Sequence, residues 1–159
     1  MIPFVRRADG VHLAMSSGER GVLTSLTEQL QQVLAGDLSA DPVAARMFPD
    51  AYPGDATASA EFGRLTRSDL LTQKTTNASV VHDWLTGVRD GALAPTDEQA
   101  WLRCLTDLRL TIAERLGITD AASEEASAAD RSDRAVGLRD VYDWIGYVQE
   151  HLVDTISTS

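Results

Sequence analysis

The sequence predicts a mainly α fold: a helical bundle with a short N-terminal β-hairpin packed on it, in a single domain over residues 1–159. Three observations lead to this prediction. Strand signals are confined to the first 15 residues, and apolar residues recur at helical spacing through most of the rest. The length and the hydrophobic content of 43% are those of one ordinary domain with its own core.

The hairpin is expected over residues 4–15. Two β-prone runs, Phe4–Arg7 and Val11–Met15, flank the segment Ala8–Gly10. Its Asp-Gly pair is typical of a tight hairpin turn. Because an isolated hairpin is only marginally stable in water, we expect this one to pack on the helices.

The first helix is expected to begin after Ser16 and to end at Gly36. Ser16 and Glu19 have the spacing of a capping box, and glycine commonly terminates helices. The apolar stripe that predicts this helix consists of Val22, Leu23, Leu26, Leu30, Val33 and Leu34.

A short second helix is predicted from Asp41 and Pro42, an N-cap and a first-turn proline, to Phe48–Pro49. Residues 57–86 then predict either one broken helix or two helices. Their apolar anchors are Phe62, Leu65, Leu70, Leu71, Val80, Val81, Trp84 and Leu85. Residues 87–95 are expected to form a loop.

The clearest helix is predicted over residues 96–116. Thr96 and Gln99 have capping-box spacing, and Gly117 follows as a stop. One face carries the stripe Trp101, Leu105, Leu108, Ile112 and Leu116. Residues 120–134 have no apolar anchor, so a solvated loop or a weak helix is expected there.

The last helix is predicted over residues 138–156. Its core stripe consists of Leu138, Val141, Tyr142, Ile145, Leu152 and Ile156. Trp144, Tyr147, Val148 and His151 widen the apolar arc well beyond the ~100° of an ordinary amphipathic helix. Such a helix is either contacted on several sides or offers an aromatic patch to another chain. Trp144, Tyr147 and His151 are therefore candidate partner-binding residues, and a homodimer is the simplest such assembly.

The charge of the chain argues against nucleic-acid binding. Lys and Arg number 14 against 24 Asp and Glu, a net charge of −10 that repels phosphate backbones. Within this acidic chain, Arg64, Arg67 and Lys74 share an arc of one helical face. This basic stripe could contact an acidic partner or a phosphate. Direct DNA binding through it is therefore one alternative hypothesis for the function. Alternatively, the three residues form salt bridges with neighbouring carboxylates.

Nothing near the N-terminus resembles a targeting signal. Arg6 and Arg7 are not followed by an apolar core, and no stretch approaches the ~20 apolar residues of a membrane span. We therefore expect a cytoplasmic protein with no membrane partner.

The candidates for chemistry are few. His82-Asp83 resembles the central pair of metal-dependent phosphohydrolases, and such a hydrolase is the alternative to a binding function. The other histidines, His12 and His151, lie at no recognisable ligand spacing, so we expect no metal and no cofactor. Cys104 is the single cysteine and is expected to be a small, half-buried residue at the flank of the helical stripe.

Asp107 and Arg109 are expected to belong to a structural ion pair. Arg109 falls beside the core stripe, where a partly buried guanidinium needs a carboxylate partner. Asp140, Asp143 and Glu150 of the last helix are further candidates for that partner.

Short motifs in a fixed order resemble one family of proteins. The first group comprises Asp41-Pro42, Phe48-Pro49-Asp50-Ala51-Tyr52, Asp55, Glu61-Phe62, Leu65-Thr66 and Lys74. The second comprises Trp101-Leu102-Arg103, Asp107-Leu108-Arg109-Leu110, Arg115-Leu116-Gly117, Tyr142-Asp143-Trp144-Ile145 and Gln149-Glu150. Together they resemble an actinobacterial family of unknown function that includes the oxidative-stress regulator AosR.

The resemblance implies a regulatory or interaction protein, not an enzyme, that acts through a protein partner such as a transcription factor. Genes of the family commonly neighbour those for a Clp-protease adaptor and for a sulfur-carrier route to cysteine, which implies a link to stress response or cysteine metabolism. A redox-switching member needs two cysteines that can pair. This chain has Ala100 and Leu108 four residues to either side of Cys104, so an intramolecular disulfide is excluded.

Overall fold

The computed structural model describes residues 2–36, 42–48, 56–117, 125–126, 129 and 132–158. The helices are α1 (Ser17–Ala35), α2 (Pro42–Met47), α3 (Ala56–Thr86), α4 (Pro95–Leu116) and α6 (Asp133–Ser157). The strands are β1 (Phe4–Arg7), β2 (Gly10–Leu13) and β3 (Ala92–Leu93). The predicted fold class, mainly helical with an N-terminal hairpin, is confirmed. Within these ranges no helix is both long and apolar enough to span a lipid bilayer.

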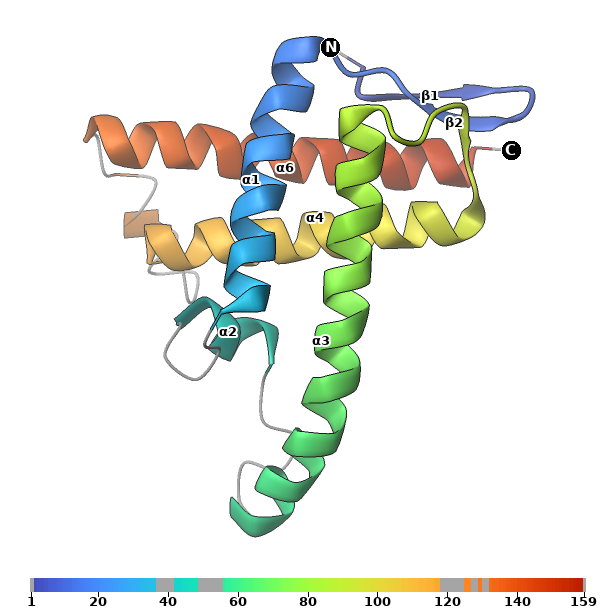
Figure 1. Ribbon diagram of the computed structural model, residues 1–159. Coiled ribbons are helices and arrows are strands. Elements are labelled where there is room, and N and C mark those ends of the chain that lie inside the picture. Colours follow the sequence, from blue (N-terminus) through green and yellow to red (C-terminus); the bar gives the residue numbers. More distant parts are fainter. Residues whose placement is uncertain are drawn as a thin grey trace.

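The long helices form two crossed pairs. α1 lies beside α3 and α4 lies beside α6, and the first pair crosses over the second (Figure 1). The buried side chains of both pairs meet in one core between them. Its fully buried members include Leu23, Leu30, Val81, Trp101, Leu105, Leu108, Ile112, Ile145 and Leu152.

The hairpin has a third strand that the sequence did not predict. β1 pairs antiparallel with β2, with Phe4 opposite Leu13, and β2 pairs with β3, with Val11 opposite Leu93. β3 lies in the segment that was expected to be a loop. It spans only Ala92–Leu93, too short to show the alternating pattern of a strand.

Two contacts fix the hairpin to the helices, as its marginal stability required. The Phe4 ring meets the Trp101 ring of α4 edge-to-face, with centroids 5.3 Å apart. The Arg6 side chain donates to the carbonyl oxygens of Thr155 and Ile156, each at 3.1 Å. These carbonyls belong to the last turn of α6, where no following turn of the helix supplies N–H donors to them.

The predicted limits of α1 and α2 are confirmed. The Ser16 and Glu19 side chains each bond the other's backbone N–H, as a capping box requires, and α1 ends before Gly36. One stripe member was placed wrongly, because Val22 is 43% exposed and lies outside the core. Asp41, the proposed N-cap of α2, lies outside the described residues.

The alternatives for residues 57–86 resolve into one helix, α3, which runs for 31 residues from Ala56. Its second half packs on α1 and α4 through Ala78, Val81, Trp84 and Leu85, all buried. The side chains of Phe62 and Leu65, two predicted anchors, lie outside the described part of the chain.

α4 begins one residue earlier than predicted and with a different cap. Pro95 takes the first helical position, so Asp97, not Gln99, is the third. The Asp97 carboxylate accepts from the Ala94 backbone N–H at 3.1 Å. The predicted capping box of Thr96 and Gln99 is therefore wrong, whereas the stop at Gly117, with φ of 74°, is confirmed.

α6 begins at Asp133, five residues before the predicted start at Leu138. Of the segment predicted as a loop or weak helix, residues 125–126, 129 and 132 are described and exposed, and the first three are helical. Val148, which the sequence placed outside the core stripe, is fully buried beside Ile145 and Leu152.

Candidate functional site

The basic stripe predicted on α3 is not a free cationic surface. The Lys74 ammonium lies 2.8 Å from Asp107 Oδ1 on α4 and is only 18% exposed. Arg67 is exposed and donates to the Phe48 carbonyl at 3.5 Å. The side chain of Arg64 lies outside the described residues. The alternative in which these residues bond inside the fold therefore holds for Lys74.

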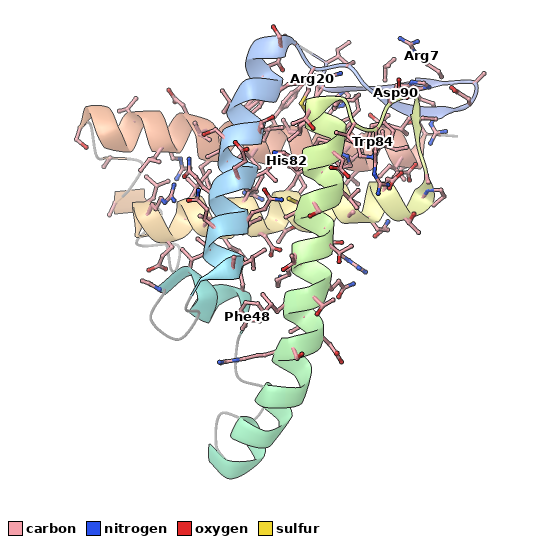
Figure 2. All side chains as sticks on the ribbon, viewed as in Figure 1. Arg7, Arg20, Phe48, His82, Trp84 and Asp90 are labelled. Atoms are coloured by element: carbon pink, nitrogen blue, oxygen red, sulfur yellow. The ribbon has the colours of Figure 1, made fainter. Side chains whose placement is uncertain are left out.

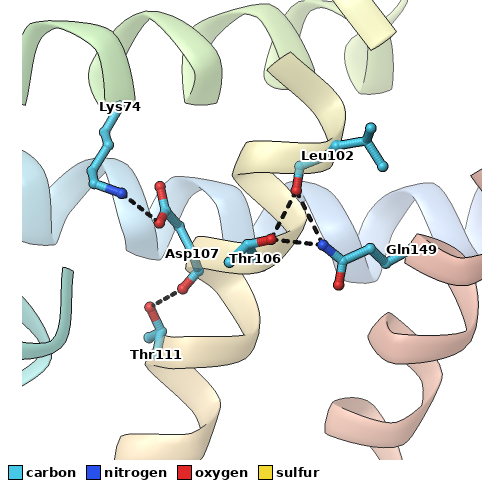
Figure 3. Close-up of polar contacts among 6 residues, drawn as sticks. All are labelled: Lys74, Leu102, Thr106, Asp107, Thr111 and Gln149. Carbon is cyan, nitrogen blue, oxygen red and sulfur yellow. Dashed lines mark hydrogen bonds and ion pairs between the residues drawn. The ribbon is translucent and has the colours of Figure 1, made fainter. Parts of the chain in front are cut away.

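The Lys74–Asp107 pair lies inside the helix bundle (Figure 3). The Asp107 side chain is 3% exposed, and its second oxygen, Oδ2, has no hydrogen-bond partner among the described residues. Thr111 donates to the Asp107 carbonyl at 2.9 Å. Burial raises the pKa of Asp107, and the hydrogen bond from Lys74 opposes that rise.

Cys104 belongs to the core, not to its flank as predicted, because it is fully buried one turn before Asp107. Burial raises the pKa of the Cys104 thiol strongly, and the nearby negative charge of Asp107 raises it further. A protonated, buried thiol is a weak nucleophile, so the arrangement is that of a core residue.

Asp107 belongs to a structural ion pair, as expected, but its partner is Lys74. The expectation that Arg109 pairs with a carboxylate is wrong for the described residues. Residues two positions apart on a helix point about 200° apart, so Asp107 faces α3 whereas Arg109 faces α6. The Arg109 guanidinium lies 4.8 Å from the centre of the Tyr142 ring and donates to Gln149 Oε1 at 3.4 Å. Its partners are thus an aromatic ring and an amide, and not Asp140, Asp143 or Glu150.

Gln149 is held in one orientation by α4 (Figure 3). Its Nε2 donates to the Leu102 carbonyl at 3.2 Å and to Thr106 Oγ1 at 2.6 Å. Thr106 itself donates to the same carbonyl at 3.1 Å. The amide oxygen of Gln149 is therefore left to accept from Arg109.

Gly146 gives a direct test of this packing. A Cβ atom at Gly146 would lie 3.5 Å from Arg109 Cζ, an ordinary van der Waals distance. Gly146→Ala is expected to raise the free energy of unfolding by about 0.5–1 kcal/mol, since alanine loses less backbone entropy in a helix. Urea unfolding measures it. A loss of stability would mean that Arg109 sits closer to α6 than described.

The pair His82-Asp83 does not gather further metal ligands. His82 Nε2 lies 3.3 Å from Glu28 Oε2 in the space between α3 and α1 (Figure 2). Asp83 faces Arg89 at 3.6 Å, and Arg89 also bonds Asp97. Across the residues that the structure describes, no three His, Cys, Asp or Glu side chains are grouped so as to hold a metal ion.

The aromatic face of α6 borders a groove against the N-terminal turns of α1. The groove encloses about 410 Å³ and is lined by Ser16, Gly18, Glu19, Val22, Asp140, Val141 and Trp144. Trp144 is half-buried at this groove, opposite the exposed Val22. Tyr147, 44% exposed, continues the face one turn along, and its ring lies 6.0 Å from that of His151. Of the predicted partner-binding residues, the structure thus brings Tyr147 and His151 together, and Trp144 lies one turn before them on α6.

Acidic side chains accompany this apolar surface. Glu19 and Asp140 line the groove, and the described residues that line it include no lysine or arginine. The Glu19 carboxylate accepts from the Ser16 backbone N–H, whereas Asp140 is exposed. Asp143 follows on the same helix, where its charge is balanced by the ion pair with Arg139. We call this surface, formed by Glu19, Val22, Asp140, Val141 and Trp144, the α1/α6 groove. It combines apolar contact area with a negative rim.

Val22 is the functional candidate that the sequence did not reveal. Its position one residue before Leu23 made it fit the apolar stripe, although it projects from the side of α1 that faces the groove. The sequence does carry one signal for this role. Leu23, Leu30 and Leu34 already fill the core face of α1, so Val22 is an apolar residue that the core does not need.

No curated protein and no solved structure matches the chain. A family model described as a domain of unknown function, DUF2017, matches residues 1–156, nearly the whole chain. The chain therefore belongs to the DUF2017 family.

Proposed function

We propose that this chain is a cytoplasmic regulatory protein that acts through a protein partner, and that the α1/α6 groove docks a basic, amphipathic helical segment of that partner. The observation that carries the proposal is the half-exposed Trp144, which lines one groove with the exposed side chains of Val22 and Asp140. Tryptophan anchors are enriched in interaction surfaces, and grooves of this kind bind the apolar face of a helix.

The charge of the groove favours a basic occupant over a second copy of the chain. A basic segment would bring cations against the exposed Asp140 and would be drawn by the net charge of −10. Two copies pairing through this face would bring their own carboxylates together, which opposes the homodimer.

The alternatives draw less support from the contacts. Direct DNA binding needs free cations, and Lys74 is engaged by Asp107 inside the bundle. A hydrolase centred on His82 and Asp83 needs converging ligands, and these two side chains bond Glu28 and Arg89 on either side of α3.

The regulatory part of the proposal is supported by sequence resemblance. The ordered motifs of the chain resemble an actinobacterial family that includes the oxidative-stress regulator AosR, which favours a role in stress response or cysteine metabolism. The partner is then a regulatory protein, such as a transcription factor, that carries the basic segment.

A pair of synthetic peptides tests the docking. Both are amphipathic helices of about 18 residues, or five turns, with the same Leu and Phe face; one carries Lys and Arg on its polar face and the other Glu. Fluorescence anisotropy of the labelled peptides should give a Kd of about 1–50 μM for the basic peptide at low salt, and at least about tenfold weaker binding of the acidic one.

Trp144→Ala should weaken binding of the basic peptide about tenfold or more, a loss of about 1.4 kcal/mol or more in binding free energy. Val153→Ala is the matched control, because Val153 is 45% exposed on the opposite side of α6. Equal binding of both peptides, or equal weakening by both variants, would contradict the proposal. A dimer in sedimentation that Trp144→Ala with Tyr147→Ala converts to a folded monomer would instead identify the occupant as a second copy.

A further inference from the structure

A second cavity lies between α4 and α6, on the side of α6 away from the α1/α6 groove. It measures about 160 Å³ and is lined by Thr106, Arg109, Leu110, Ala113, Tyr142 and Gln149. The lining combines polar side chains with the apolar side chains of Leu110 and Ala113. Arg109 is its charged member.

The hydrogen-bonding capacity of Arg109 is largely unused. Nη1 donates to Gln149 Oε1 at 3.4 Å, whereas Nε is buried and has no acceptor in the described part of the chain. Nη2 makes no hydrogen bond to the described residues, and no described carboxylate lies within 4.0 Å of the guanidinium. A partly buried guanidinium normally has an anionic partner, because unpaired donors away from water cost free energy that an acceptor recovers.

The guanidinium is held in place before any ligand arrives. The Tyr142 ring packs against it, the backbone of α6 at Gly146 lies beside it, and Gln149 accepts a hydrogen bond from one of its nitrogens. A donor that is already oriented loses little conformational freedom on binding. The other charged groups near the ring, Arg139 and Asp143, bond each other and contribute no net charge.

We propose that this cavity binds a small oxyanion, either phosphate or a short-chain carboxylate, through Arg109. The planar guanidinium matches the oxygens of both anions. At ~30 Å³ per water molecule, the cavity replaces only a few waters, so it fits one phosphate group or a carboxylate with a short alkyl chain. The apolar side chains of Leu110 and Ala113 would contact that chain.

The test uses inorganic phosphate and butyrate as separate probes, with sodium chloride at matched ionic strength as the reference. Two-dimensional NMR follows the Arg109 Nε–H and the Gln149 side-chain amide, and a thermal melt follows Tm. We expect saturable shifts of these signals with a Kd of about 0.1–5 mM for at least one probe, together with a rise in Tm that chloride does not produce.

Arg109→Gln should abolish the response, whereas Arg103→Gln, an exposed arginine on the same helix, should retain it. A response to phosphate alone or to butyrate alone supports the proposal and identifies the ligand class. If Arg109→Gln fails to fold, the wild-type NMR shifts decide the question: shifts confined to Arg109 and Gln149 support the proposal. Shifts spread over the surface, equal effects of chloride, or an equal loss in Arg103→Gln would overturn the proposal. Because this cavity is separate from the α1/α6 groove, its failure would leave the docking proposal unaffected.

Discussion

Lys74→Met is expected to lower the free energy of unfolding by about 2–4 kcal/mol at pH 7, since removing one partner of a buried ion pair leaves an uncompensated charge. Asp107 is 3% exposed, and its Oδ2 already lacks a partner among the residues that the structure describes, so the orphaned carboxylate has little access to water. Lys74 itself is 18% exposed, which places the expected cost below that of a fully buried pair. Urea denaturation measures the change.

Two comparisons show whether the pair causes the loss. The double variant Lys74→Met with Asp107→Leu should recover most of the stability, because replacing both charges by apolar groups removes the desolvation cost. Arg103→Met, an exposed cation on α4, should change the free energy of unfolding by no more than about 0.5 kcal/mol. A Lys74→Met protein as stable as the wild type would show that the ammonium does not reach Asp107.

The same variant should depend on pH with a defined sign. Burial raises the pKa of Asp107 above its ordinary 3.8, and removing Lys74 raises it further, because the bond from Lys74 is what lowers it. A carboxyl group with a raised folded-state pKa is most favourable to folding below its ordinary value, and that contribution is lost as the pH rises through the folded pKa. The loss caused by Lys74→Met should therefore be smaller at pH 5 than at pH 7.

Trp101→Ala is expected to cost about 3–5 kcal/mol, the range for removing a fully buried tryptophan. Trp101 joins the hairpin to α4 through its edge-to-face contact with Phe4. Amide hydrogens of β1 and β2 should consequently exchange faster in the variant, because the hairpin loses its apolar support. Trp144→Ala, at a half-exposed position, should cost about 1 kcal/mol or less. A loss below that level for Trp101→Ala would contradict the described core.

Local signals predicted most of the fold. The capping box at Ser16 and Glu19, the stop at Gly117 and the stripes on α1 and α4 depend on residues near one another in the chain. The failures have equally local causes. At α4, Pro95 moved the helix start by one residue, so the capping role passed to Asp97. β3 forms by pairing with the free edge of β2. This pairing depends on a distant segment, so the sequence of residues 92–93 does not predict it.

The sites depended on long-range packing and were predicted only in part. Trp144, Tyr147 and His151 were identified because they lie outside the apolar stripe with which α6 faces the core. Val22, on the α1 side of the groove, could be identified only from the structure, in which α1 crosses α6 (Figure 1). Likewise, the helical phase separates Asp107 from Arg109, but the lysine that faces Asp107 lies 33 positions away on another helix.

The docking of a basic segment in the α1/α6 groove is tested most directly by the indole N–H signals of the three tryptophans. Trp84 and Trp101 are buried in the core, whereas Trp144 lines the groove. Titration with the basic amphipathic peptide should shift the Trp144 indole signal and the backbone amides of Glu19, Val22 and Asp140, and leave the other two indoles in place. Binding that leaves the Trp144 signal unmoved would contradict the proposal.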